Sequence, residues 1–189
     1  EGSNAYASLP NGGDKESNRQ VVAAAAKIVG IDPNIGLLTA AMESSFNHNA
    51  SAGKAKGLKG FMPGTWDDMM RKNAVKYGIP SGTSPTDPKA ASLLGAQYLK
   101  DNLDRAAKKG ITPNIETAYL MHFLGPYDGP KAIKLPDDAN MVQEFPSAAK
   151  LNKPYFYNSD GSPRTKAHIT MSGNYKLTIY DDNAETNNQ

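Results

Sequence analysis

The chain of 189 residues carries 21 Lys and Arg against 19 Asp and Glu, for a net charge of +2, and contains no cysteine. This length predicts one compact domain with its own hydrophobic core. The absence of cysteine excludes disulfide scaffolds, cysteine-based zinc sites and thiol nucleophiles. The weak positive charge, with no Lys/Arg run of five or more, argues against nucleic acid as a partner.

No apolar segment is long enough to span a bilayer, since the longest, residues 35–42, falls far short of the roughly 20 residues required. We therefore expect no membrane partner. Because the chain opens on Glu1 and its first residues are rich in Gly, Asn and Ser, we interpret it as part of a longer polypeptide. We expect a flexible segment over residues 1–17, a domain over 18–180 and a disordered tail over 181–189.

Proline and glycine punctuate the predicted helices. Asp32-Pro33, Asp87-Pro88 and Thr112-Pro113 each join a capping side chain to a proline at the first helical position, and glycines mark the helix ends. In chain order, helices are predicted at residues 18–29, 33–46, 66–77, 88–109, 113–124, 130–135 and 139–145, with a loop at 151–163 and a helix at 165–176. No alternating pattern is long enough for a strand, so the fold class is mainly α.

Glu43 is the only formally charged side chain between Pro33 and Gly53. The preceding residues, 35–42, are apolar nearly all round, which is typical of a buried helix. Burial and the negative C-terminal end of the helix dipole both disfavour the charged form of this carboxyl. A carboxyl held protonated near neutral pH is what a general acid requires. The alternative is that Glu43 simply reaches solvent at the helix end.

Residues 47–64 (NHNASAGKAKGLKGFMPG) are dense in small and turn-forming residues, yet they include Leu58, Phe61 and Met62. Such a connection between two helices favours a shaped loop that walls a cleft over a slack linker. Thr65 is predicted to cap the next helix, with Asp68 in the acidic position of a capping box.

Four stretches resemble the signature of soluble lytic transglycosylases and related goose-type lysozyme-like domains. They are ESSFN from Glu43, ASAG from Ala50, AKGL from Ala55 and FMPGT from Phe61. A later block, residues 118–126 (AYLMHFLGP), is similar to the family motif that places a tyrosine opposite the catalytic glutamate. Its His-Phe-Leu-Gly form, and the tail over residues 152–165, resemble phage-encoded, virion-associated members.

The resemblance covers about residues 18–176 and implies a lysozyme-like fold, a helical domain with a substrate cleft. It implies cleavage of the β-1,4 bond between MurNAc and GlcNAc of peptidoglycan, with formation of 1,6-anhydroMurNAc. Glu43 would be the sole catalytic acid and base, first protonating the leaving oxygen and then taking the proton of the C6 hydroxyl that closes the anhydro ring. Ordinary glycoside hydrolysis uses two carboxyl groups instead.

The resemblance also carries over substrate-binding positions. Ser51 matches a serine near the acid, and Tyr119 matches the tyrosine that orients the glutamate or supports the developing charge. The other expected substrate-binding residues are Leu58, Lys59, Gly60, Met62 and His122.

Two departures from the family pattern affect this set. The family's usual Gly-Leu-Met-Gln is here Gly-Leu-Lys59-Gly60, so a glutamine that binds sugar is replaced by glycine. Lys59 is expected to compensate through its charge on an anionic glycan or its peptide. His122, one turn from Tyr119, stands where a Tyr-Asn pattern is commoner, and it either lines the cleft or packs within its helix.

His48 and His168 lack metal-ligand spacing, so we expect no metal site and no cofactor. The expected partner is the peptidoglycan glycan strand, and the expected setting is a phage virion or tail assembly that opens the bacterial wall. An exported bacterial enzyme would share the chemistry. Two other functions stay open: a hydrolytic muramidase, and a non-catalytic glycan-binding structural module of a virion. The second stays open because Gly60 replaces the family's glutamine.

Overall fold

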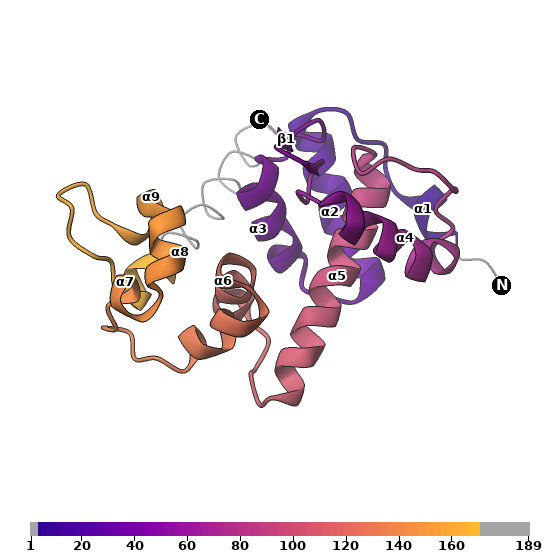
Figure 1. Cartoon of the computed structure of the whole chain (residues 1–189). Coiled ribbons are helices and arrows are strands. Elements are labelled where there is room, and N and C mark those ends of the chain that lie inside the picture. The colour runs from indigo at the N-terminus through magenta and orange to yellow at the C-terminus, as the bar shows by residue number, and fades with distance from the viewer. Residues whose placement is uncertain (1–3, 171–189) are drawn as a thin grey trace, which may run out of the picture. The chain divides into compact units, whose positions relative to one another are not determined.

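The computed structural model describes residues 4–170 and is mainly helical, which confirms the predicted fold class (Figure 1). The described residues form two compact units, 4–101 and 102–170, and the boundary falls within helix α5 (Pro88–Lys108). Over this part of the chain, no helix combines the length and the apolar character needed to cross a membrane.

The first unit contains three of the predicted helices and part of a fourth. Its elements are α1 (Ala5–Ser8), α2 (Lys15–Val29), α3 (Pro33–Ser44), β1 (Ser51–Ala52), β2 (Ala55–Lys56), α4 (Pro63–Tyr77) and the first part of α5. The N-terminal segment expected to be flexible holds α1 and the start of α2. There Leu9 is buried, and Asp14 and Ser17 cap α2 reciprocally. Sequence reasoning missed this cap because serine takes the place of the usual Glu or Gln at its second position.

Helices α2 and α3 pack against each other in this unit. Gly36 of α3 lies close to Ala26 of α2, since a Cβ at Gly36 would be 3.2 Å from the Ala26 Cβ. Helix α3 begins as predicted, because the Asp32 carboxylate accepts from the Asn34 amide at 2.9 Å and Pro33 occupies the first turn.

Helix α3 ends at Ser44, two residues earlier than expected, because Ser45 and Phe46 both adopt left-handed backbone (φ 50° and 61°). Phe46 is 1% exposed, so its ring fixes this turn in the core. The buried Asn18 of α2 donates its amide to the Phe46 carbonyl at 2.9 Å and lies 3.1 Å from Nδ1 of His48. A polar residue inside α2 therefore holds the chain that follows α3.

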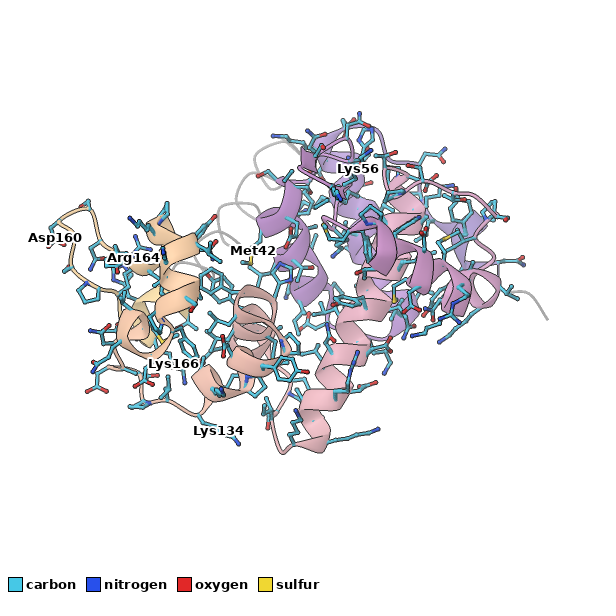
Figure 2. All side chains as sticks on the ribbon, viewed as in Figure 1. Met42, Lys56, Lys134, Asp160, Arg164 and Lys166 are labelled. Atoms are coloured by element: carbon cyan, nitrogen blue, oxygen red, sulfur yellow. The ribbon has the colours of Figure 1, made fainter. Side chains whose placement is uncertain are left out.

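The loop after this turn is built from short backbone pairs. Strands β1 and β2 pair antiparallel, with Ser51 opposite Lys56. They were not predicted because two residues are too few for an alternating pattern. Lys56, labelled in Figure 2, also exchanges two backbone hydrogen bonds of 3.0 Å with Phe61. These bonds close residues 57–60 into a tight loop.

The predicted cap of α4 is wrong. The helix begins at Pro63 with Met62 as its N-cap residue, and Thr65 lies in the first turn. Proline supplies the start here, because its missing amide hydrogen needs no partner at that position. Asp68 instead accepts from Arg71 at 2.6 Å, three residues on. Trp66 is buried, and its ring packs edge-to-face on Phe61.

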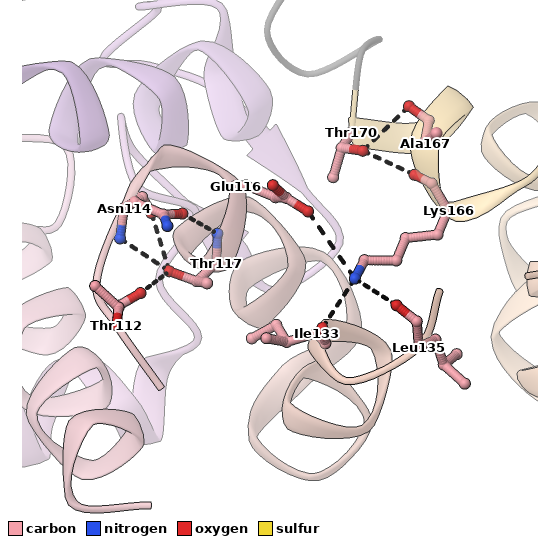
Figure 3. Close-up of polar contacts among 9 residues, drawn as sticks. All are labelled: Thr112, Asn114, Glu116, Thr117, Ile133, Leu135, Lys166, Ala167 and Thr170. Atoms are coloured by element: carbon pink, nitrogen blue, oxygen red, sulfur yellow. Dashed lines mark hydrogen bonds and ion pairs between the residues drawn. The ribbon is translucent and has the colours of Figure 1, made fainter. Parts of the chain in front are cut away.

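The second unit contains the rest of α5 with α6 (Ile115–Ile133), α7 (Met141–Glu144), α8 (Pro146–Leu151), α9 (Lys153–Phe156) and helical residues 166–170. Helix α6 starts two residues later than predicted, because Asn114 and Thr117 form a reciprocal cap (Figure 3). Gly125 (φ 86°, ψ 179°) breaks α6 where the sequence placed a helix end, and a second helical stretch follows it.

The tail of this unit differs in part from the prediction. Helix α9 lies inside the loop expected at 151–163, with Pro154 in its first turn. Of the helix expected at 165–176, residues 166–170 are helical, and residues 171–176 lie outside the described range, as does the tail 181–189. The Lys166 ammonium donates to the carbonyls of Ile133 and Leu135, each at 2.8 Å, and so caps the end of α6 (Figure 3).

Gly57 provides a test of how tightly the loop is packed. It has φ 84°, and an added Cβ would lie 1.9 Å from the Pro85 carbonyl oxygen, whereas Gly53 (φ 62°) has nothing within 4 Å. We expect Gly57→Ala to lower the free energy of unfolding by about 2–5 kcal/mol and Gly53→Ala to lower it by about 1–2 kcal/mol. Both substitutions strain the backbone, but only the methyl group at position 57 clashes with a neighbouring atom. Urea unfolding measures both. Equal losses would contradict the packing of residues 57 and 85.

Candidate active site

Glu43 lies in the last turn of α3, as the sequence predicted. Met42, the residue before it, is labelled on this helix in Figure 2. Residues 35–41 are all buried, which confirms the buried helix, but Glu43 itself is exposed. The expected desolvation of the carboxyl is therefore wrong, and the alternative, that the side chain reaches solvent, describes the structure. A rigid apolar helix thus ends in an acid that an external substrate can reach.

Ser44 connects this helix end to the loop over residues 57–60. Its hydroxyl lies 3.0 Å from the Ala40 carbonyl oxygen and 2.9 Å from that of Leu58. Leu58 is fully buried, so its side chain packs in the core. The prediction of Leu58 as a substrate-binding residue is corrected accordingly, because no surface of that side chain is available to a glycan.

Gly60 lies directly against the carboxyl of Glu43. A Cβ at this position would be 2.5 Å from Glu43 Oε2 and 3.2 Å from its Cδ, and the backbone has φ 61°. A glutamine here would therefore displace the glutamate. Because glycine stands here in place of the family's glutamine, the Glu43 carboxyl can occupy this space.

Lys59 points inward. Its Nζ lies 2.8 Å from the Gly36 carbonyl oxygen and 2.8 Å from Thr39 Oγ1, both on α3. This corrects the expectation that Lys59 meets an anionic glycan. Burial of the ammonium lowers the pKa of Lys59 from its usual 10.5 to about 7, and the nearby Glu43 carboxylate opposes this shift.

Ser51 and Met62 lie on the surface of the same unit. Ser51 is exposed on β1, and Met62 is 48% exposed at the start of α4. Both side chains are accessible to a ligand, so their assignment to substrate binding stays a prediction. Phe61, between the loop and α4, is buried and packs on Trp66 and Tyr98.

Tyr119 and His122 belong to α6 in the second unit. Tyr119 is 3% exposed and stacks on Phe123, with ring centroids 5.8 Å apart. Burial raises the pKa of Tyr119 to about 12; Tyr155 adds to this shift and Arg164 opposes it. The phenol is consequently a neutral hydroxyl at physiological pH. His122 is half-buried, and its two alternative placements stay open.

Sequence reasoning missed the surroundings of Tyr119. Phe123 also packs on Tyr155 and Phe156 at 5.6 and 5.4 Å, so an aromatic cluster supports the tyrosine. Arg164 acts on the same hydroxyl through its charge, and its Nε is buried without a hydrogen-bond partner in the described residues. Tyr155, Phe156 and Arg164 lie more than thirty positions after Tyr119 and Phe123, so no spacing pattern links the two groups.

Within residues 4–170, no group of three or more His, Cys, Asp or Glu side chains is placed to hold a metal ion. His48 interacts with Asn18, as described above, and so belongs to the turn after α3.

One comparison with known proteins identifies the family. A family model described as the Transglycosylase SLT domain matches residues 20–125. The chain belongs to this family, which acts on peptidoglycan. The match includes Glu43, the loop at residues 57–60 and Tyr119, and it ends at Gly125, where α6 is broken. The resemblance stated from the sequence is thereby confirmed at the level of the family.

The lowered pKa of Lys59 predicts a pH dependence of stability. Between pH 7 and 10.5 the unfolded state binds the Lys59 proton more strongly than the folded state, so the folded protein gains stability as pH rises through this window. Relative to Lys59→Met, wild type should gain about 1 kcal/mol per pH unit above pH 7. Urea unfolding between pH 6.5 and 9 measures the difference. The control is Lys54→Met at an exposed position, and parallel curves for wild type and Lys59→Met would contradict the burial of the ammonium.

Gly60 predicts a separation of stability from activity. Gly60→Ala and Gly53→Ala introduce nearly the same backbone strain (φ 61° and 62°), so both should lose similar stability. Only the added methyl at position 60 reaches Glu43, and misplacement of a catalytic group by about 1 Å lowers rates up to about 100-fold. We expect turbidity loss of purified cell walls to slow at least about 10-fold for Gly60→Ala alone. Equal activities in the two variants would be the contrary result.

Proposed function

We propose that this chain is a peptidoglycan lytic transglycosylase that cleaves the β-1,4 bond between MurNAc and GlcNAc and forms 1,6-anhydroMurNAc. Membership of the SLT family supplies the substrate class. The observation that carries the proposal is the exposed Glu43 carboxyl at the end of a buried helix, with Gly60 against it and the Lys59 ammonium nearby. This arrangement presents one acid on rigid support, as proton transfer to a bound glycan requires.

A single carboxyl suffices for this reaction. Protonated Glu43 gives its proton to the glycosidic oxygen, the bond from that oxygen to C1 of MurNAc breaks, and GlcNAc leaves with a free 4-hydroxyl. The Glu43 carboxylate then takes the proton of the MurNAc C6 hydroxyl, and the C6 oxygen bonds to C1 to close the anhydro ring. Glu43 ends protonated again and no water is consumed. The reaction therefore needs no second carboxyl to act as nucleophile or to activate water, as hydrolysis does.

Tyr119 is proposed to support the charge that develops during this reaction or to orient Glu43. Burial raises the pKa of Tyr119 to about 12, so at neutral pH its phenol is an uncharged hydrogen-bond donor or acceptor. Ser51, Lys59, Met62 and His122 complete the proposed site. Of these, Ser51, Met62 and His122 are proposed to contact the glycan, whereas Lys59 faces α3.

The proposed setting is a phage virion or tail assembly that opens the wall locally. Its support is the sequence alone: the His-Phe-Leu-Gly form after Met121 and the stretch at residues 152–165, which lies beyond the family match. An exported bacterial enzyme is the alternative. Mass spectrometry of purified virions tests the setting, since the protein should be a stoichiometric component of the particle.

Glu43→Gln tests the assigned acid. The substitution preserves size and removes the proton donor, so circular dichroism should be unchanged while turbidity loss of purified cell walls falls by about 100-fold or more. Glu16→Gln, at an exposed position on α2, is the matched control and should retain activity. A Glu43→Gln enzyme with near wild-type activity would exclude Glu43 as the catalytic acid.

The released products distinguish the candidate functions. A transglycosylase gives anhydro-muropeptides, which are lighter by one water than the reducing-end products of a hydrolytic muramidase. Mass spectrometry of the digest therefore decides between the two chemistries. Binding to cell walls without release of soluble muropeptides would identify the non-catalytic glycan-binding module instead.

A further inference from the structure

Two successive ring contacts join Tyr119 to Phe156. The Tyr119 ring stacks on that of Phe123, with centroids 5.8 Å apart and 19° between the ring planes. Phe123 in turn stacks on Phe156, at 5.4 Å and 27°. Tyr119 is 3% exposed and Phe156 is fully buried, so water does not separate these rings. Because Phe123 contacts both of the others, the place of Phe156 limits where Phe123 and Tyr119 can lie.

Phe156 stands at the base of a short hairpin formed by residues 156–164. The amide of Arg164, which is labelled in Figure 2, donates to the Phe156 carbonyl at 2.8 Å. Nearer the tip, the Asn158 amide donates to the Ser162 carbonyl at 2.8 Å, and their side chains lie 3.0 Å apart. Backbone pairing on both sides of the hairpin therefore fixes the Phe156 backbone.

The same segment is attached to the far end of α6. The Arg164 carbonyl accepts from the Met141 amide at 3.1 Å, two residues before Lys166. The Lys166 ammonium donates to the carbonyls of Ile133 and Leu135, each at 2.8 Å. Residues 156–166 thus hold α6 on both sides of its break, by ring contact before the break and by hydrogen bonds after it.

Phe123 receives limited support from its own helix. The break at Gly125 lies two residues after it, and Pro126 supplies no amide hydrogen to the carbonyl of residue 122. The last turn before the break therefore lacks one hydrogen bond of a regular helix. Contacts from outside α6 consequently matter more for the direction of the Phe123 ring than they would in the middle of an unbroken helix.

We propose that Phe156 is a positioning residue that holds Tyr119, through Phe123, in the orientation that glycan cleavage requires. The inference rests on the proposed function, in which the Tyr119 hydroxyl supports the developing charge or orients Glu43. Phe156 is fully buried, so it acts without touching the glycan. It also lies thirty-one positions beyond Gly125, where the family match ends.

The first test is the effect of Phe156→Leu on kcat. Leucine keeps an apolar side chain at the site and removes the ring that Phe123 stacks on. Misplacement of a catalytic group by about 1 Å lowers rates up to about 100-fold, so kcat on soluble peptidoglycan fragments should fall about 10-fold with KM little changed. Phe145→Leu removes another buried ring of the same unit, at the start of α8, and as the matched control should retain kcat.

A double-mutant cycle separates positioning from general packing. Tyr119→Phe removes the hydroxyl and keeps the ring that stacks on Phe123. If Phe156 acts through that hydroxyl, Phe156→Leu lowers kcat about 10-fold in wild type but less than about 2-fold in the Tyr119→Phe background. A loss of packing that acts elsewhere would lower kcat by the same factor in both backgrounds.

NMR of the protein with isotope-labelled tyrosine tests the positioning without any reaction. The Tyr119 ring signal is the one that Tyr119→Phe removes, and the ring current of the stacked Phe123 displaces it. Phe156→Leu should change this displacement at neutral pH, whereas Phe145→Leu should leave it in place. If Phe156→Leu does not fold, Phe156→Met serves instead, because its flexible side chain fills irregular space without a ring.

Several results would overturn the proposal. An unmoved Tyr119 signal, or equal falls of kcat in the two backgrounds, would show that Phe156 only packs in the core. A rise in KM with kcat unchanged would assign Phe156 to glycan binding, and a Tyr119→Phe enzyme with wild-type kcat would leave no hydroxyl to position. The proposed function fails separately: in that case wild type releases no soluble muropeptides from cell walls, whatever the Tyr119 signal does.

Discussion

The attachment of residues 57–60 to the end of α3 is the constraint on which the candidate site depends. The Ser44 hydroxyl contacts the Leu58 carbonyl, and the Leu58 side chain is fully buried, so the loop is held at both its backbone and its core. Helix α3 is rigid because it is buried on nearly all sides, and it ends sharply in the left-handed turn of Ser45 and Phe46. The acid and the loop consequently share one support.

Two adjacent residues of the loop, Lys59 and Gly60, shape the surroundings of the Glu43 carboxyl. Gly60 leaves space beside Glu43 on the loop side, and Lys59 brings a cation to the helix side. Both differ from the Met-Gln pair that is usual in the family. Gly60 replaces a glutamine that would bind sugar and leaves space beside the Glu43 carboxyl. Lys59 replaces an apolar methionine with a chargeable side chain.

The sequence predicted those features that local chemistry determines. Asp32 with Pro33, and the apolar run before Glu43, were sufficient to place α3 and its acid, because caps and burial act over a few residues. The direction of Lys59 was not predictable, because the glycine that admits its stem lies 36 positions later, at Gly95. The burial of Leu58 and the exposure of Glu43 likewise depend on contacts between distant segments, for which periodicity gives no signal.

The cap that Lys166 places on α6 has a consequence for protein engineering. The family match ends at Gly125, in the middle of α6, yet the far end of that helix is held by an ammonium from residue 166. A fragment cut at the edge of the family match would leave α6 half-formed and its last carbonyls without their cation. A catalytic module transplanted into a fusion protein should therefore carry the chain through at least Thr170, well beyond the segment that defines its family.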